Sequence, residues 1–121
     1  MRAVGIILAG GNSNKMRELT HKRAVAAMPI AGSYRAIDFA LSNMSNSHIQ
    51  KVAVLTQYNA RSLNEHLNSS KWWDFGRKQG GLYVFTPTIT AENGYWYRGT
   101  ADAIYQNLDF LKRCHEPYVI I

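Results

Sequence analysis

The sequence is poor in cysteine and in long apolar runs. Its single cysteine, Cys114, cannot form an internal disulfide, which excludes a disulfide-stabilised secreted scaffold and favours a reducing, cytoplasmic setting. A membrane helix needs roughly 18 or more consecutive apolar residues, and no stretch of the sequence reaches that length. The apolar N-terminal stretch runs into Gly10-Gly11 without the cleavage pattern of a secretion signal. We therefore expect no membrane partner and no exported scaffold.

Acidic residues are also few. Eight Asp and Glu stand against fourteen Lys and Arg, which gives a net charge of +6. This excess favours an anionic partner, such as a nucleotide, a sugar phosphate, RNA or an acidic surface. The alternative is a solvated basic face without a partner. A hydrophobic content of 46% excludes a disordered chain, and residues 1–121 suffice for one small domain.

The most informative stretch lies at the N-terminus. The apolar run Val4–Leu8 predicts a buried strand, and Ala9, Gly10-Gly11 and the basic Lys15 follow it. Ligands of an open α/β sheet bind beyond the carboxyl ends of its strands, and glycines let them approach the main chain. The pattern indicates a site for an anionic ligand, most simply a nucleotide phosphate. The alternative is an ordinary turn with solvated charges. The spacing matches neither a P-loop nor a dinucleotide-binding fingerprint.

Strand and helix patterns alternate along the rest of the chain. Strands are predicted over residues 51–56, 82–86 and 118–121, and helices over 34–47, 59–68 and from Thr100 onward. Asn59 and Thr100 are expected to cap the last two helices, and Pro117 to stop the final one. Residues 12–33 are expected to form a long basic loop. The alternation predicts an α/β fold, with a Rossmann-like, mostly parallel sheet covered by helices on both faces.

Aromatic side chains gather in the predicted loop over residues 69–81. Trp72, Trp73 and Phe75 would be costly to leave in water, so we expect them to pack against another part of the protein. A stacking platform for nucleic-acid bases is the alternative. Together with the basic loop, that alternative would make the chain a small nucleic-acid-binding module. We favour packing and expect no nucleic-acid partner.

Four segments in order resemble one family. They are residues 8–11 (LAGG), 34–43 (YRAIDFALSN), 55–58 (LTQY) and 96–103 (WYRGTADA). Each is similar to a motif of the sugar nucleotidyltransferases, and within them of the bacterial glucose-1-phosphate adenylyltransferases. The motifs occur in family order over nearly the whole chain, so their combination is far more specific than any one of them.

The resemblance implies a reaction. ATP and glucose 1-phosphate give ADP-glucose and pyrophosphate with Mg²⁺, through in-line attack of a sugar-phosphate oxygen on the α-phosphorus, and ADP-glucose then feeds glycogen synthesis. By the same resemblance, the nucleotide is expected to lie along Leu8, Ala9, Gly10 and Gly11, with its base and ribose held by Gln57 and the turn of Gly99, Thr100 and Ala101. Arg35 and Asp38 are expected to form a structural ion pair that fixes the loop.

The chain departs from the family pattern at its phosphate-handling positions. Ser13 replaces a loop glycine, and Lys15 replaces the arginine that contacts the triphosphate. Lysine keeps the charge but lacks the planar fork that grips phosphate in a bidentate way. Val25 stands where the family carries a lysine, and valine cannot stabilise developing negative charge. Losing one electrostatic donor commonly costs about 10²–10³ in rate. Lys15 is therefore the only catalytic candidate, and a weak one.

A third departure is an absence. The family's metal-holding aspartate follows a strand that resembles Tyr118–Ile121, so the resemblance puts the Mg²⁺ ligands beyond this sequence. The sugar site and a C-terminal β-helix would also lie beyond it. We therefore expect residues 1–121 to be the N-terminal part of a nucleotidyltransferase domain in a longer protein.

Two interpretations within the family stay open. The first is a weakly catalytic or regulatory subunit, in a hetero-oligomer with a catalytic subunit or in a homo-oligomer. The second is a fully active adenylyltransferase in which Lys15 and either Arg17 or Lys22 take over the lost contacts.

Overall fold

The computed structural model describes residues 2–11, 15–16, 18, 23–57, 60–69, 81–87 and 96–121. In chain order the elements are β1 (Ala3–Ala9), η2 (a 3₁₀ turn, Val25–Ala27), β2 (Pro29–Ile30), β3 (Tyr34–Arg35), α1 (Ala36–Asn46), β4 (Lys51–Thr56), α2 (Ala60–Ser69), β5 (Gly81–Phe85), α3 (Thr100–Gln106), α4 (Leu108–Arg113) and β6 (Tyr118–Ile120). Each of the four predicted long strands is confirmed to within about one residue. Within these residues no helix is long and apolar enough to cross a membrane.

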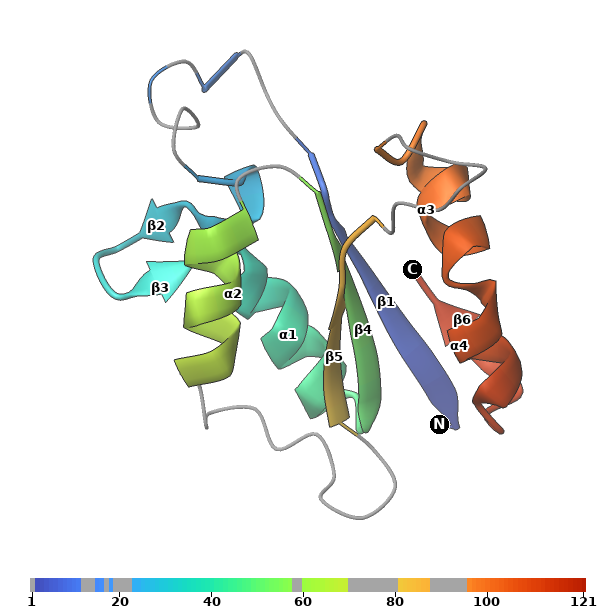
Figure 1. The fold of residues 1–121 in the computed structure, drawn as a ribbon. Helices are drawn as coiled ribbons and strands as arrows, with labels where there is room; N and C mark the ends of the chain where they lie inside the picture. Colours follow the sequence, from blue (N-terminus) through green and yellow to red (C-terminus); the bar gives the residue numbers. More distant parts are fainter. Residues whose placement is uncertain are drawn as a thin grey trace.

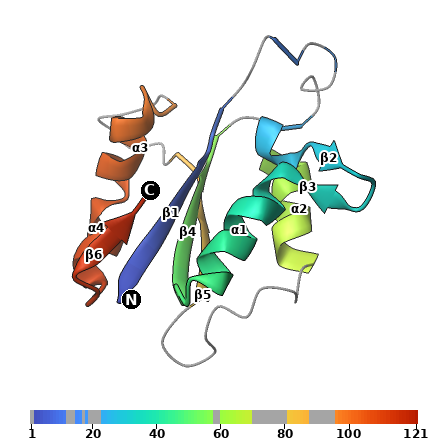
Figure 2. The ribbon, with the colours of Figure 1, turned by 180° about the vertical axis from the view of Figure 1, so that it is seen from behind.

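A parallel sheet of four strands, in the order β5-β4-β1-β6, forms the middle layer. Helices α1 and α2 lie on one face of it, and α3 and α4 lie on the other (Figures 1 and 2). Because both faces are covered, the central strands read as nearly continuous aliphatic runs rather than alternating ones. The predicted α/β layer fold with a parallel sheet is confirmed.

Alternate residues of β4 enter two separate cores. Val52 and Val54 pack with Leu41 of α1 and Leu63 of α2. Leu55 points the other way, into a smaller cluster that includes Ile6, Tyr97 and Ala103. This division follows from the two-residue period of a strand, which sends successive side chains to opposite faces. Strand β4 therefore anchors both helix layers.

Gly5 lets α1 approach β1 closely. A Cβ at this position would lie 2.9 Å from the Sδ atom of Met44. Ile37 and Leu41 lie on the same face of α1 as Met44, and this face packs on the sheet.

The start of α1 differs from the prediction. Residues 34–35 form strand β3, which pairs with β2 in an antiparallel hairpin, so the helix begins at Ala36. The turn between the strands is closed by Ala31 and Gly32, whose φ angles are 50° and 87°. The expected long loop over residues 12–33 therefore contains a 3₁₀ turn and one strand of the hairpin in its described part. Two-residue strands are too short to leave a period in the sequence.

The final helix also differs, because it is two helices. Asn107 interrupts it, and the Asn107 side-chain amide donates to the Ala103 carbonyl oxygen (2.8 Å) and to the Tyr97 hydroxyl (3.1 Å). Asparagine commonly competes with the helix ladder in this way. The prediction that Pro117 stops the helix was wrong, because α4 already ends at Arg113 and Cys114 is extended.

The predicted cap at Thr100 was also wrong. Thr100 is the first residue of α3, and Gly99 occupies the cap position without a side-chain hydrogen bond. The Oδ2 atom of Asp102, in the first turn, instead accepts from the backbone amide of Arg98, the residue before the cap position, at 2.8 Å. Helix α2 agrees with its predicted range to within one residue. Its expected cap Asn59, together with Trp72, Trp73 and Phe75, lies outside the described residues.

Strand β6 pairs with β1 over a short stretch. Ala3, Val4 and Gly5 of β1 pair in parallel with Tyr118, Val119 and Ile120. Tyr118 and Val119 are exposed, whereas Val4 is buried. The first and last strands of the chain are therefore neighbours.

Removing a buried leucine from α1 should destabilise the fold strongly. Leu41 is fully buried in the larger core, so Leu41→Ala should lower the free energy of unfolding by about 2–5 kcal/mol. Phe39 lies on the same helix but is exposed, and Phe39→Ala should cost less than about 1 kcal/mol. Urea denaturation of both variants checks this, and equal losses would contradict the assignment of the core.

Candidate functional site

Gly10 and Gln57 lie against each other where β1 and β4 end. Strand register pairs Ala9 with Thr56, so the next residue of each chain segment meets at the carboxyl edge of the sheet. A Cβ on Gly10 would lie 3.1 Å from the Cβ of Gln57 and 3.7 Å from its backbone nitrogen. Glycine is needed here because the two segments approach closely. Two of the residues predicted to bind nucleotide are thus direct neighbours.

Gly11 differs from Gly10, because a Cβ there would meet none of the described residues within 4 Å. Among those residues, nothing covers its backbone on that side. Leu8 and Ala9 lie behind it in the strand, with Ala9 buried in the larger core. Along the residues predicted to bind the nucleotide, the chain thus passes from the buried Ala9 to the exposed Gly11.

Thr56 stiffens this edge. Its side chain is fully buried, and its hydroxyl donates to the carbonyl oxygen of Phe85 at 3.3 Å. The bond ties the end of β4 to the end of β5. The backbone positions of Gly10 and Gln57 are consequently set by the strands that precede them.

The turn of Gly99, Thr100 and Ala101 opens α3 at the same edge of the sheet (Figure 1). All three residues are exposed, and a Cβ on Gly99 would meet none of the described residues within 4 Å. The carboxylate of Asp102 lies in the first helical turn and accepts from the Arg98 amide. A carboxylate there already compensates the positive end of the helix. The turn therefore suits a hydroxyl group better than a phosphate.

The phosphate-handling positions are described only in part. Lys15 is exposed, and Ser13, Arg17 and Lys22 lie outside the described residues. Val25 begins η2 and is half-buried, and its neighbours Ala24 and Ala27 are buried in the larger core. The position of residue 25 is thus fixed by packing, and no charged group occupies it.

Arg35 and Asp38 have structural roles, but the predicted pairing between their side chains was wrong. The Oδ2 atom of Asp38 accepts from the backbone amide of Arg35 (2.8 Å), and its Oδ1 atom meets Nε2 of His66 (2.6 Å). The Arg35 guanidinium instead donates to the carbonyl oxygen of Ala27 at 2.6 Å. A carboxylate three residues after the helix cap commonly accepts from the free backbone amide of the cap residue. The Arg35 guanidinium is therefore available to bind the Ala27 carbonyl of η2.

Sequence reasoning missed His66. Leu63 and Leu67 are buried, and His66 lies on the same face of α2. A polar residue on the apolar face of a helix could have indicated a hydrogen bond near the core. The side chains of His66 and Asp38 are only 19% and 11% exposed. Their contact joins α2 to the start of α1.

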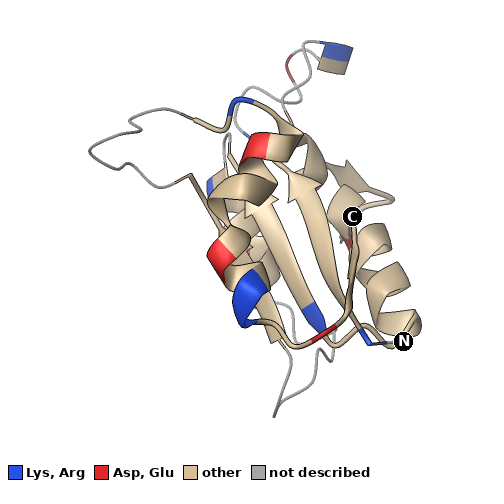
Figure 3. Ribbon diagram, turned by 90° about the vertical axis from the view of Figure 1, so that its right-hand side faces the viewer, with Lys and Arg blue, Asp and Glu red and all other residues tan. Residues whose placement is uncertain are grey.

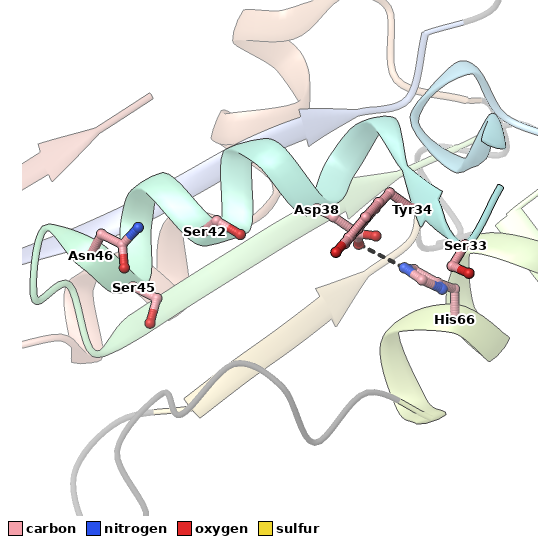
Figure 4. A pocket seen from close by; sticks show the side chains of 7 residues that line it. All are labelled: Ser33, Tyr34, Asp38, Ser42, Ser45, Asn46 and His66. Carbon is pink, nitrogen blue, oxygen red and sulfur yellow. Dashed lines mark hydrogen bonds and ion pairs between the residues drawn. The ribbon is translucent and has the colours of Figure 1, made fainter. Parts of the chain in front are cut away.

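A pocket of about 440 Å³ lies between α1, the β2–β3 hairpin and α2 (Figure 4). Its described lining residues are Ser33, Tyr34, Asp38, Ser42, Ser45, Asn46 and His66. None of them was predicted as a ligand-binding residue. The pocket is formed within the helix layer, whereas Gly10 and Gln57 lie where the strands end.

A family model described as nucleotidyl transferase matches residues 4–121. The chain belongs to the nucleotidyl transferase family. Similar proteins named glucose-1-phosphate adenylyltransferase come from Clostridium kluyveri (49% identical, covering 98% of this chain and 31% of that protein), Thermosipho africanus (47%, 98% and 29%) and Clostridium perfringens (48%, 98% and 30%). The chain therefore spans about 30% of the length of these relatives.

The described part of this nucleotidyl transferase chain offers no metal centre. Within it, no three His, Cys, Asp or Glu side chains come together as ligands for a metal ion. We assign none of the described residues to the metal.

Charged residues of both signs are interspersed on the α3–α4 face, with Lys112 and Arg113 adjacent at the end of α4 (Figure 3). Near this face Lys51 pairs with Glu116 at 3.4 Å, between side chains that are 16% and 21% exposed. Partial burial favours a raised pKa for Glu116, but hydrogen bonds from backbone amides and the charge of Lys51 outweigh it, and the pKa is lowered. The basic patch that nucleic-acid binding needs is not formed by the described residues of this face.

Cys114 is not placed or activated as a nucleophile. It precedes β6, so it lies at the amino edge of the parallel sheet, opposite Gly10. Its thiol donates to the carbonyl oxygen of Phe110 at 3.2 Å. Burial raises the pKa of the thiol, Lys51 opposes the rise, and Glu116 adds to it. A raised pKa lowers the thiolate fraction at neutral pH.

Filling the space between Gly10 and Gln57 should disturb the edge of the sheet. Gly10→Val should lower the free energy of unfolding by about 1–3 kcal/mol through overpacking, because a Cβ already comes within 3.1 Å of Gln57. Gly11→Val is the matched control and should cost less than about 1 kcal/mol. Chemical denaturation compares the two variants. A smaller loss for Gly10→Val than for Gly11→Val would show that the edge is not tightly packed.

Cys114 should react slowly with alkylating reagents at neutral pH. The raised pKa reduces the thiolate that attacks iodoacetamide, so the native chain should be modified several-fold more slowly at pH 7 than the urea-unfolded chain. The difference should shrink as the pH rises through the thiol pKa. Mass spectrometry follows the reaction. Equal rates for native and unfolded protein at pH 7 would contradict the assignment.

Proposed function

We propose that this chain is the nucleotide-binding part of a glucose-1-phosphate adenylyltransferase subunit with weak or no catalysis of its own. The whole subunit would bind ATP, together with glucose 1-phosphate or ADP-glucose, in the reaction that supplies ADP-glucose for glycogen synthesis. The observation that carries the proposal is the combination of 47–49% identity to proteins of that name with valine at position 25.

Nucleotide binding is supported by the carboxyl edge of the sheet. Gly10 and Gln57 form its tight centre, and Gly11 is open beside them. In the proposal the nucleotide lies along Leu8, Ala9, Gly10 and Gly11. Gln57 contacts the base, and the turn of Gly99, Thr100 and Ala101 contacts the ribose. The hydroxyl preference that Asp102 gives to this turn agrees with that assignment.

Weak catalysis follows from the charges that this site lacks. Attack on the α-phosphorus builds negative charge, and the protein contributes mainly by positioning and by electrostatic stabilisation. Val25 contributes no charge from its fixed place in η2. Lys15 is exposed and is the remaining cation assigned to the phosphates. Mg²⁺ would supply further positive charge at the triphosphate when bound.

The proposal includes the organisation of the protein. Residues 1–121 would be the N-terminal part of the nucleotidyltransferase domain, with the rest of that domain and a β-helix following. The subunit would work in a hetero-oligomer with a catalytic subunit, or in a homo-oligomer, in the cytoplasm. A fully active enzyme is the second candidate. It is favoured by the exposure of Lys15, which leaves that ammonium group available to the triphosphate.

Restoring the charge at residue 25 and the guanidinium fork at residue 15 should raise turnover in the full-length protein. Val25→Lys combined with Lys15→Arg should increase kcat for ADP-glucose synthesis about tenfold or more, because each restored donor stabilises charge that develops in the transition state. Val25→Met with Lys15→Arg is the matched control, since it lengthens the side chain at residue 25 without adding charge. It should give a smaller increase.

Two measurements decide between the candidates. ATP titrations by calorimetry, against UTP, should show selective ATP binding by the unsubstituted protein. A wild-type enzyme with high turnover that falls on Val25→Lys would instead establish the fully active enzyme. A folded protein that binds no nucleotide would reject both.

A further inference from the structure

The pocket between α1, the hairpin and α2 has the size of a small-ligand site and is open to solvent on one side. Its volume of about 440 Å³ falls within the range of roughly 300–1,000 Å³ typical of such sites. Figure 4 shows side chains from three separate elements around it. The contact of Asp38 with His66 joins α1 to α2, and the hydrogen bond from Arg35 to Ala27 joins the hairpin to η2. The two helices that line the pocket are therefore tied together at one end of it.

Helix α1 presents a polar stripe to this pocket. Asp38, Ser42, Ser45 and Asn46 recur at the spacing of one helix face and line the cavity, next to the apolar stripe that packs on the sheet. Serine and asparagine are poorer helix formers than alanine, lysine or glutamate. The stripe thus places hydrogen-bonding side chains in the cavity at some cost in helix propensity.

The chemistry of the lining selects a neutral ligand. Its one carboxylate, Asp38, already has two partners, the Arg35 amide and the His66 ring. The other polar groups are hydroxyls and an amide, which both donate and accept hydrogen bonds. Among the described lining residues there is no lysine or arginine to compensate a phosphate.

The pocket also offers an aromatic surface. Tyr34 lines it and is 60% exposed, so its ring is available to a ligand with an apolar face. The C–H face of a pyranose ring is such a surface, and the hydroxyls at the rim of the ring match the serine and asparagine side chains.

We propose that this pocket binds a small neutral saccharide, separately from the nucleotide site at the sheet edge. The ligand would rest one ring face on Tyr34 and exchange hydrogen bonds with Ser42, Ser45 and Asn46. The inference rests on the geometry of the pocket and does not require the proposed reaction.

The test is a titration of the full-length protein with maltose, followed by calorimetry or by saturation-transfer NMR. Maltose should bind with a dissociation constant on the order of 1 mM. Glucose 6-phosphate and inorganic phosphate serve as anionic probes and should bind this pocket more weakly. ATP binding is measured in parallel as a readout of the other site.

Substitutions on α1 locate the bound sugar. Ser42→Ala with Asn46→Ala should weaken maltose binding about tenfold or more, at about fivefold for each hydrogen-bonding group removed. Alanine favours the helix, so the variant should stay folded. Asn43→Ala is the matched control, because Asn43 is exposed on the same helix and is not among the residues that line the pocket. It should leave maltose binding unchanged, and ATP binding should be the same in all three proteins.

Three results would overturn the proposal. The first is no maltose binding at tens of millimolar by a folded protein. The second is maltose binding that survives the double substitution, which would place the sugar elsewhere. The third is that glucose 6-phosphate or phosphate binds more tightly than maltose, and that the double substitution abolishes this binding. The pocket would then be an anion site. A loss of ATP binding without a change in maltose binding would count against the proposed nucleotide function and would not affect the saccharide proposal.

Discussion

The helix layer of this protein depends on one largely buried carboxylate. Asp38 receives the backbone amide of Arg35 and the ring of His66, so it joins the hairpin, the start of α1 and α2 at a single point. Leaving a buried hydrogen-bonding group without its partner costs about 1–3 kcal/mol, and more where the group is charged. The packing of the three elements is therefore coupled through this carboxylate. Because the Arg35 guanidinium also holds Ala27, the position of η2 follows from the same carboxylate.

Binding and catalysis rest on different parts of the chain. The closest approach in the candidate nucleotide site, Gly10 against Gln57, is set by the register of β1 and β4 and cannot change without disturbing the sheet. The phosphate-handling positions 15 and 25 lie outside the sheet, so a change of charge there leaves strand pairing intact. This separation gives a physical reason why a subunit could keep its nucleotide fold while its turnover declines.

The long periodic elements were predictable from the sequence, and the short ones were not. The apolar run of β4 and the leucines of α2 each left a period long enough to identify the element. The hairpin of β2 and β3 has two residues in each strand and left none. The break at Asn107 arose from a side chain that bonds to Tyr97, a contact that local pattern does not contain. The contact of Asp38 with His66 and the polar pocket likewise depend on how α1 and α2 pack. The resemblance to the family named the candidate nucleotide residues, and the adjacency of Gly10 and Gln57 came only with the sheet register.

The pairing of the first strand with the last has a consequence for synthesis on the ribosome. Strand β1 is translated first, yet its pairing with Tyr118, Val119 and Ile120 has to wait until β6 has emerged. Until then, one edge of β1 has no strand beside it, although Val4 is destined for the core. Contacts between residues this distant in sequence slow folding and expose unpaired edges to association. In the nascent chain this edge of β1 should therefore stay open to association until β6 has been released from the ribosome.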